Sequence, residues 1–241
     1  MATGHTVKAF DQDLDELRAL ISQMGGLAEN AIRESMRCLK QRDCDGARQV
    51  VEDDEKLDLL EAEAERKVVQ LIALRAPMAD DLREAVAALK IAGVVERIGD
   101  YAKNIAKRVQ LMEDVSEIEP ISLLPEMARI AAEMVHNALD AFVERDAAKA
   151  KRVCERDKVV DDFYNSIFRA LLTFMMENPQ RITQSAHLLF IAKNLERIGD
   201  HCTNIAENVY FLVTGRQPGG ERPKGGKDEL NVVAPAKQNA S

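Results

Sequence analysis

Apolar residues recur every three to four positions along most of this chain, and strand-like alternation of apolar and polar residues is absent. This period is typical of amphipathic helices. Asp43 or Asp45 is placed to cap the second helix, Asp80 the third and Asp146 the fifth. We therefore expect six helices, near 6–42, 45–75, 79–113, 122–145, 147–177 and 181–213.

This helical pattern occurs twice along the chain, as an internal repeat. Residues such as Asp54 have an identical counterpart 103 positions later, and from Ile91 onward the offset between the two copies is 100. Pro77 and Pro179 mark matching breaks before the third and sixth helices. An up-down-up bundle of three helices buries one apolar stripe from each helix. The sequence therefore predicts an all-α fold of two tandem, similar three-helix bundles, at 6–114 and 122–214, with the boundary near 116–125. Residues 215–241, rich in Gly and Pro, are predicted to form a disordered tail.

Composition narrows the class of protein. The 241 residues are 46% hydrophobic and only 4% aromatic, a mixture that favours helices. The net charge of −8 argues against nucleic-acid binding, which needs basic surfaces. The four cysteines form no CxxC pair and no zinc-ligand spacing, so we interpret them as reduced, mostly buried small residues. The N-terminal residues lack the pattern of a signal peptide, and no apolar run approaches the ~18 residues of a membrane span. We expect a soluble, cytoplasmic protein.

The strongest chemical signal is a duplicated phrase, ERIGDxxxNIA, at 96–106 and 196–206. Its polar residues lie at i, i+4 and i+8, which stacks them in one row with about 6 Å of rise between them. Two carboxylates four residues apart repel unless a positive charge lies between them. The repeated row therefore indicates a cation site in each half, formed by Glu96, Asp100 and Asn104 and by Glu196, Asp200 and Asn204.

A second acidic pair lies on the middle helix of each half: Asp54 with Asp58, and Asp157 with Asp161. If the rows and pairs face one another, several carboxylate oxygens converge, a ligand set that suits hard cations such as Mg²⁺, Ca²⁺, Mn²⁺ or iron. The alternative is a solvated acidic surface neutralised by neighbouring arginines or lysines.

Glycine occupies the same position of both rows, at Gly99 and Gly199, although glycine inside a helix costs about 1 kcal/mol relative to alanine. Close approach of a neighbouring helix or access for a ligand would explain it.

Glu133 and His136 form a single ExxH motif, whereas a di-iron bundle needs two. The sequence contains no phosphate-binding loop and no activated nucleophile.

The duplicated phrase, joined to DxxxD on the preceding helix of each half, resembles the PhoU family over residues 6–214. The resemblance implies two similar three-helix bundles in one chain, often dimeric, that bind metal through acidic motifs of this kind. It also implies a non-enzymatic repressor of the phosphate-starvation response. Such a protein acts between the ATPase subunit of the phosphate ABC transporter and a sensor histidine kinase, and reaches the membrane only through these partners.

Carried onto this sequence, the resemblance assigns metal ligands in both halves. They are Glu96, Asp100 and Asp54 or Asp58 in the first half, and Glu196, Asp200 and Asp157 or Asp161 in the second, with Asn104 and Asn204 as supports. The metal would be Fe, Mn, Mg or Zn. Two other functions stay open at this point: a metal-dependent phosphoesterase and a metal-free helical scaffold.

Overall fold

The computed structural model describes residues 3–112 and 118–216. The prediction of an all-α fold is confirmed, and within the described ranges there is no strand. The predicted helices agree with the observed ones to within a few residues at most ends, and the third helix ends at Val109 rather than near 113. The predicted tail beyond Arg216 lies outside the described residues. The elements are α1 (Thr3–Gln41), α2 (Cys44–Arg75), α3 (Asp80–Val109), η1 (Glu119–Leu123), α4 (Leu124–Glu144), α5 (Ala147–Glu177), η2 (Pro179–Arg181) and α6 (Ile182–Thr214).

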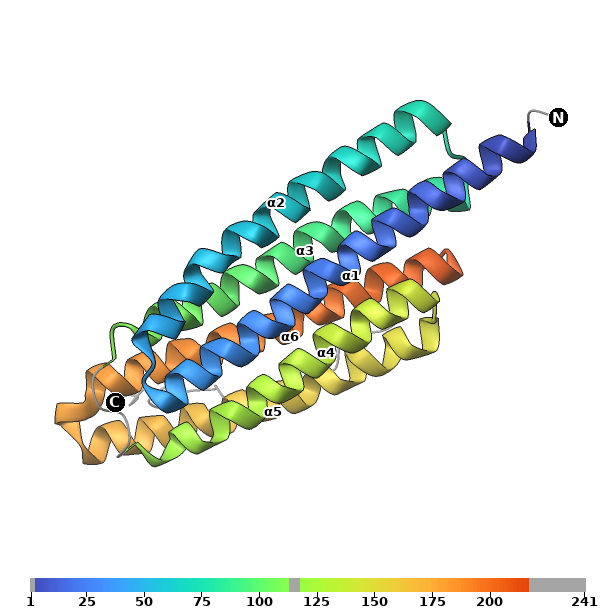
Figure 1. The fold of residues 1–241 in the computed structure, drawn as a ribbon. Helices are drawn as coiled ribbons and strands as arrows, with labels where there is room; N and C mark the ends of the chain where they lie inside the picture. The colour runs from blue at the N-terminus through green and yellow to red at the C-terminus, as the bar shows by residue number, and fades with distance from the viewer. Residues whose placement is uncertain (1–2, 113–117, 217–241) are drawn as a thin grey trace, which may run out of the picture.

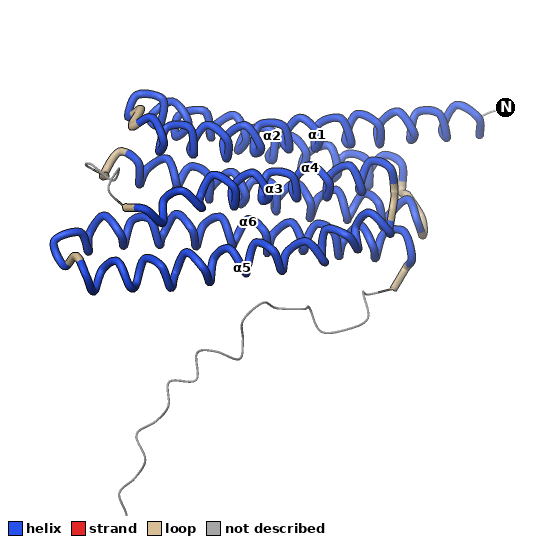
Figure 2. The backbone as a smooth tube through the Cα atoms, turned by 90° about the horizontal axis from the view of Figure 1, so that it is seen from below, coloured by secondary structure: helices blue, strands red, loops and turns tan. Residues whose placement is uncertain are grey.

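The two repeats lie side by side along their length (Figure 1). Helix α3 packs along α6 and α1 packs along α4, so these four helices form the centre of the molecule. Helix α2 packs against α1 and α3 at one outer edge, and α5 packs against α4 and α6 at the other. Figure 2, turned by 90°, shows the six helices running lengthwise through the molecule. Each repeat is thus a three-helix unit whose middle helix lies on the outside.

One hydrophobic core runs through both repeats. Helix α4 shows why: alanines such as Ala131 and Ala138 and large side chains such as Met127 and Phe142 are all fully buried on it. Each large apolar side chain buried in this way stabilises the fold by about 1.5–3 kcal/mol. The repeats therefore share one core, and neither is a separate bundle on a linker.

The predicted caps of α2 and α5 are confirmed. Asp43 accepts a hydrogen bond from the backbone N–H of Gly46, and Asp146 accepts from two N–H groups in the first turn of α5. The residue before each cap, Arg42 or Arg145, has left-handed backbone with φ of 57° or 54°. The chain therefore reverses direction in the same way at both places.

The prediction that Asp80 caps α3 is wrong. The residue before α3 is Ala79, which has φ of 51° and makes no side-chain cap. The short loop around Pro77 brings the chain out of α2 through left-handed Ala76 and into α3 through left-handed Ala79. Asp80 therefore already belongs to the first turn of α3, where it pairs with Arg83 at 3.1 Å.

A buried carboxylate joins the two repeats near the start of α3. Glu84, only 2% exposed, accepts hydrogen bonds from the Arg18 guanidinium on α1 and lies 3.2 Å from the Arg145 guanidinium between α4 and α5. A buried carboxylate is stable when it is paired in this way. At the corresponding position the second repeat carries Gln184, so this ion pair is a feature of one repeat.

Candidate metal sites between the outer and central helices

The acid rows of α3 and α6 face the acid pairs of α2 and α5. A Cβ added at Gly99 would lie 3.5 Å from Asp54 Oδ1 and would overlap Leu57, and a Cβ added at Gly199 would lie 2.7 Å from Asp157 Oδ1. Asp54 and Asp157 are each 8% exposed. The two glycines therefore permit the close approach of the neighbouring helix, one of the two explanations that the sequence offered for them.

Carboxylates crowd together in the first repeat. Burial, then the carboxylate of Asp100, and then those of Glu61 and Asp58 raise the pKa of Glu96 to about 7. Burial and then the Asp54 carboxylate also raise the pKa of Asp58. The predicted acids of this repeat are thus close enough to affect one another, and their mutual repulsion favours either a proton or a cation among them.

Lys103 supplies a cation to part of this cluster. Its Nζ donates to Asp54 Oδ2 on α2 and lies 3.3 Å from Asp100 Oδ1 on its own helix. The hydrogen bond to Asp54 is the largest cause that raises the pKa of Lys103, so its ammonium stays charged. Lys103 therefore bridges the outer and central helices at the place where the sequence predicted a metal ion.

The second repeat is arranged differently. Thr203 stands where the first repeat has Lys103, and its hydroxyl donates to the Asp200 carbonyl oxygen at 2.7 Å. A different lysine, Lys193, approaches Glu196 Oε1 to 2.6 Å and lies over the Tyr164 ring. Burial raises the pKa of Glu196, and Lys193 opposes that rise. Glu196 Oε2 is buried and has no hydrogen-bond partner.

The side chains of Asn104 and Asn204 do not lie in line with the acids of their rows. Asn104 is exposed, and Asn204 lines a cleft that it shares with Glu96 of the other repeat. Four residues of α-helix turn through about 400°, so each step of the row drifts by about 40° around the helix. After two steps the amide has moved from the face that carries the acids toward the neighbouring repeat. The supporting role of these amides stays a prediction.

The residues of the two repeats do not fit a metal ion equally well. Within residues 3–112 and 118–216, no three side chains of His, Cys, Asp or Glu are grouped so that they could hold one. In the first repeat the ammonium of Lys103 already lies between Asp54 and Asp100, so these residues do not fit an ion. In the second repeat the partnerless Glu196 Oε2 is an oxygen that a cation could satisfy. The ligand assignments therefore stay predictions, and the second repeat is the better candidate.

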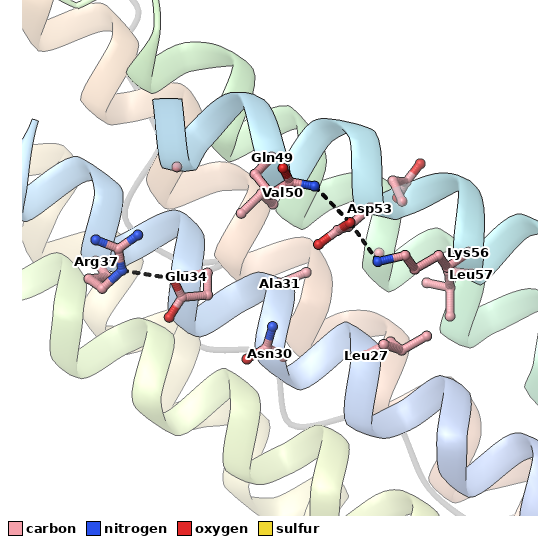
Figure 3. A pocket seen from close by; sticks show the side chains of 13 residues that line it. Leu27, Asn30, Ala31, Glu34, Arg37, Gln49, Val50, Asp53, Lys56 and Leu57 are labelled. Atoms are coloured by element: carbon pink, nitrogen blue, oxygen red, sulfur yellow. Dashed lines mark hydrogen bonds and ion pairs between the residues drawn. The ribbon is translucent and has the colours of Figure 1, made fainter. Parts of the chain in front are cut away.

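A groove between α1 and α2 reaches the other side of Asp54 (Figure 3). Its walls carry polar pairs: Arg37 donates to Glu34 at 2.7 Å, and Asp53 accepts from Gln49 at 3.0 Å and from Lys56 at 2.7 Å. The hydrogen bond from Lys56 and that from Gln49 lower the pKa of Asp53. The polar groups of the groove thus satisfy one another, and we assign it no ligand.

Four residues that shape these sites were missed in the sequence: Lys103, Lys193, Glu61 and Tyr164. Lys103 follows Asp100 by three residues, and Lys193 precedes Glu196 by three, so each shares a helical face with its acid. Both stand where the two repeats differ. A comparison of the differing positions of the repeats would have found them.

Of the remaining histidine and cysteine candidates, His201 and Cys202 belong to the packing, whereas His136 and Cys44 are exposed. His201 stacks on Tyr101 with ring centroids 5.3 Å apart, and Cys202 is fully buried. His136 lies 3.3 Å from Glu29 across the contact between α1 and α4. All four cysteines are free thiols, and Cys44 is the exposed one.

These features define an all-α protein built from a duplicated three-helix unit with an acid row in each copy. The family model described as "PhoU domain" matches residues 21–109 and again 124–209. The chain therefore belongs to the PhoU family, and the internal repeat of the sequence corresponds to two copies of that domain.

Relatives from several bacteria span nearly the whole chain. A protein of Zymomonas mobilis named phosphate-specific transport system accessory protein PhoU homolog is 55% identical over 94% of this chain and 95% of its own length. A protein of Caulobacter vibrioides with the same name is 47% identical over 92% and 97%. The crystal structure of PhoU from Pseudomonas aeruginosa matches with a TM-score of 0.82 and 35% identity, covering 86% of this chain and 100% of that one.

The fold extends to more distant relatives. The phosphate transport system regulatory protein PhoU from Streptococcus pneumoniae matches with a TM-score of 0.80 at 25% identity, covering 87% of this chain and 99% of that one. Separately, none of the helices in the described part of the chain is both long and apolar enough to span a membrane.

Proposed function

We propose that this chain is a cytoplasmic regulator of phosphate uptake that represses the phosphate-starvation response. It acts as an adaptor between the ATPase subunit of the phosphate ABC transporter and the sensor histidine kinase. The observation that carries this proposal is the match of both repeats to the PhoU domain, together with relatives named as accessory proteins of phosphate-specific transport.

The proposed role is that of an adaptor without catalysis. The side chains at the centre of the molecule are engaged in packing: His201 stacks on Tyr101, and burial raises the pKa of the Cys202 thiol well above its ordinary value. A thiol in that state is a poor nucleophile. By contrast, rigid helices with long outer faces suit the binding of partner proteins.

The metal-binding part of the proposal concerns the second repeat. The ion would be held by acids of two helices: Glu196 and Asp200 on α6, and Asp157 and Asp161 on α5. It would supply a positive charge that offsets the negative charges of both helices. Glu196 directs one oxygen to Lys193 and leaves the other buried. The chain's own contribution is to hold α5 against α6 and so to fix the shape of the surface offered to a partner.

The test uses the full chain with membranes that contain the transporter and the kinase. At high phosphate, the added protein should lower both phosphate uptake and kinase autophosphorylation. The variant with Glu196→Ala and Asp200→Ala should stay folded by circular dichroism and lose metal by elemental analysis. If the wild-type chain changes neither phosphate uptake nor autophosphorylation, the proposed function is wrong.

A further inference from the structure

One place that is equivalent in the two repeats is filled by side chains in the second repeat and is open in the first. Gly93 corresponds to Lys193, Glu61 to Tyr164, and Lys90 to Phe190. In the second repeat the place is filled: Lys193 Nζ lies 5.1 Å from the centroid of the Tyr164 ring and 2.6 Å from Glu196 Oε1. Phe190 in turn lies under the Arg108 guanidinium, 4.4 Å away.

In the first repeat the same place is an open cleft of about 500 Å³ between α2, α3 and α6. Gly93 gives it room, because a glycine has no side chain to enter it. The Glu61 carboxylate lies beside this glycine, with Oε1 at 3.6 Å from where a Cβ would stand. Glu96 lines the same cleft. The cleft therefore keeps the glutamate of the second repeat's site, has a second carboxylate where that site has Tyr164, and lacks its lysine.

No lysine or arginine within the described residues forms an ion pair with Glu61 or Glu96. Lys103 is occupied by Asp54 and Asp100, and the exposed Lys90 and Arg97 line the cleft without pairing to either glutamate. Two partly buried carboxylates with no cation between them favour a positively charged occupant.

We propose that this cleft binds a lysine side chain of a partner protein, with its ammonium between Glu61 and Glu96 and its stem over Gly93. The second repeat provides the template, because Glu196 already binds the ammonium of a lysine at the corresponding place. Glu207 also lines the cleft, but no three His, Cys, Asp or Glu side chains of the described residues are grouped so that they could hold a metal ion, which favours a single ammonium over a divalent cation. This inference rests on the proposed function only for the identity of the partner.

The test of the cleft uses the full chain and n-butylammonium, which reproduces the lysine side chain. The Val94 amide resonance, which is present in the wild type and in both variants and belongs to a residue lining the cleft, should shift in a saturable manner with n-butylammonium and not with the neutral 1-butanol. Gly93→Lys should abolish the shift, because its own ammonium would reach Glu96 as Lys193 reaches Glu196. Lys193→Gly should open a cleft with the Glu196 carboxylate beside the Tyr164 ring and add a second, weaker n-butylammonium site.

Gly93→Lys is expected to fold, because a Cβ there makes only an ordinary contact of 3.6 Å with Glu61. Two results would overturn the proposal: no saturable shift in the wild type, or the same shift in Gly93→Lys. Binding of Mn²⁺ at Gly93 that displaces n-butylammonium would also overturn it, since the cleft would then be a metal site.

The partner is tested with the purified ATPase subunit and with the kinase. Gly93→Lys should weaken binding of one of them by about tenfold, the effect of losing one well-placed charged contact. Full affinity of Gly93→Lys for every partner that the wild type binds would overturn the docking role. Failure of the wild type to bind either partner would instead overturn the proposed function, and the n-butylammonium titration would still decide the cleft.

Discussion

The two repeats carry the same acids but neutralise them with different lysines. In the first repeat Lys103 bridges Asp54 and Asp100, whereas no lysine or arginine of the described residues forms an ion pair with Glu96. In the second, Lys193 pairs with Glu196, and position 203 is a threonine. The comparison teaches that a duplicated acid row does not mean a duplicated cation site. What each row can bind depends on neighbouring residues that the two repeats do not share.

Exchanging the lysine at the bridging position should have the largest effect on cation binding. Lys103→Thr removes the ammonium between Asp54 and Asp100, so equilibrium dialysis against Mn²⁺ should show an additional ion bound to the first repeat. Thr203→Lys should abolish binding to the second repeat, because its ammonium would bridge Asp157 and Asp200. Unchanged stoichiometry in both variants would remove the distinction between the repeats. Circular dichroism checks that each variant is folded.

The next largest effect is expected at Glu84, a buried ion-pair partner whose counterpart in the other repeat is Gln184. Glu84→Ala leaves the guanidinium groups of Arg18 and Arg145 without their shared acceptor, and breaking a buried ion pair in this way costs about 3–5 kcal/mol. Urea unfolding should show this loss. Glu84→Gln, which copies the second repeat, should cost less, and an equal loss in both variants would show that the charge is unimportant.

Two helical glycines of the first repeat should respond in opposite directions. Gly99→Ala forces Leu57 to move and should destabilise the fold by about 1–3 kcal/mol, the usual cost of overpacking. Gly93→Ala meets only an ordinary contact and should stabilise it by up to about 1 kcal/mol, the difference in helix propensity. Thermal melts of both variants measure the contrast. A stabilising Gly99→Ala would contradict the close approach of α2 to α3.

The smallest expected effect is on how the free energy of unfolding depends on pH, through the titration of Glu96. Its folded-state pKa of about 7 lies above the ordinary 4.5, so folding favours the protonated carboxyl. The stability that this supplies is fully present below pH 4.5 and is lost as pH rises through 7. In chelator-treated protein, Glu96→Gln should therefore stabilise the fold at pH 8 by roughly 1 kcal/mol, after allowance for solvent screening.

At pH 4 the same substitution should have little effect, because the carboxyl is then protonated in both the folded and the unfolded chain. The matched control is Glu196→Gln, which removes the negative charge that pairs with Lys193 and should bring no comparable gain at pH 8. Equal responses of the two variants in urea titrations would show that the lysine makes no difference between the repeats.

Much of the fold could be predicted from the sequence. The apolar period locates six helices because each is long enough to show many turns, and Asp43 and Asp146 reveal two of the helix starts. The internal offset also pairs each acid row with the correct middle helix. The side-by-side packing could not be predicted, because a repeat says how each copy folds and nothing about how the copies contact each other.

The candidate site was predictable only in part. The convergence of the acids follows from their helical spacing and from Gly99 and Gly199, which mark where the helices come close. The roles of Lys103 and Lys193 depend on which side chain reaches which oxygen across two helices, and spacing on one helix does not contain that information. The supporting role of the asparagines stays a prediction, and the drift of about 40° per step of the row shows that spacing alone does not place their amides beside the acids.

The Tyr101–His201 stack lies where α3 and α6 touch, on the same two helices that carry the acid rows. A close-packed interior has little room to absorb a displaced helix locally. If an occupant tilts α3 against α2, the motion must therefore reach α6 through these stacked rings. Binding to one repeat would then change the position of a helix in the other repeat, so the two binding sites would be coupled.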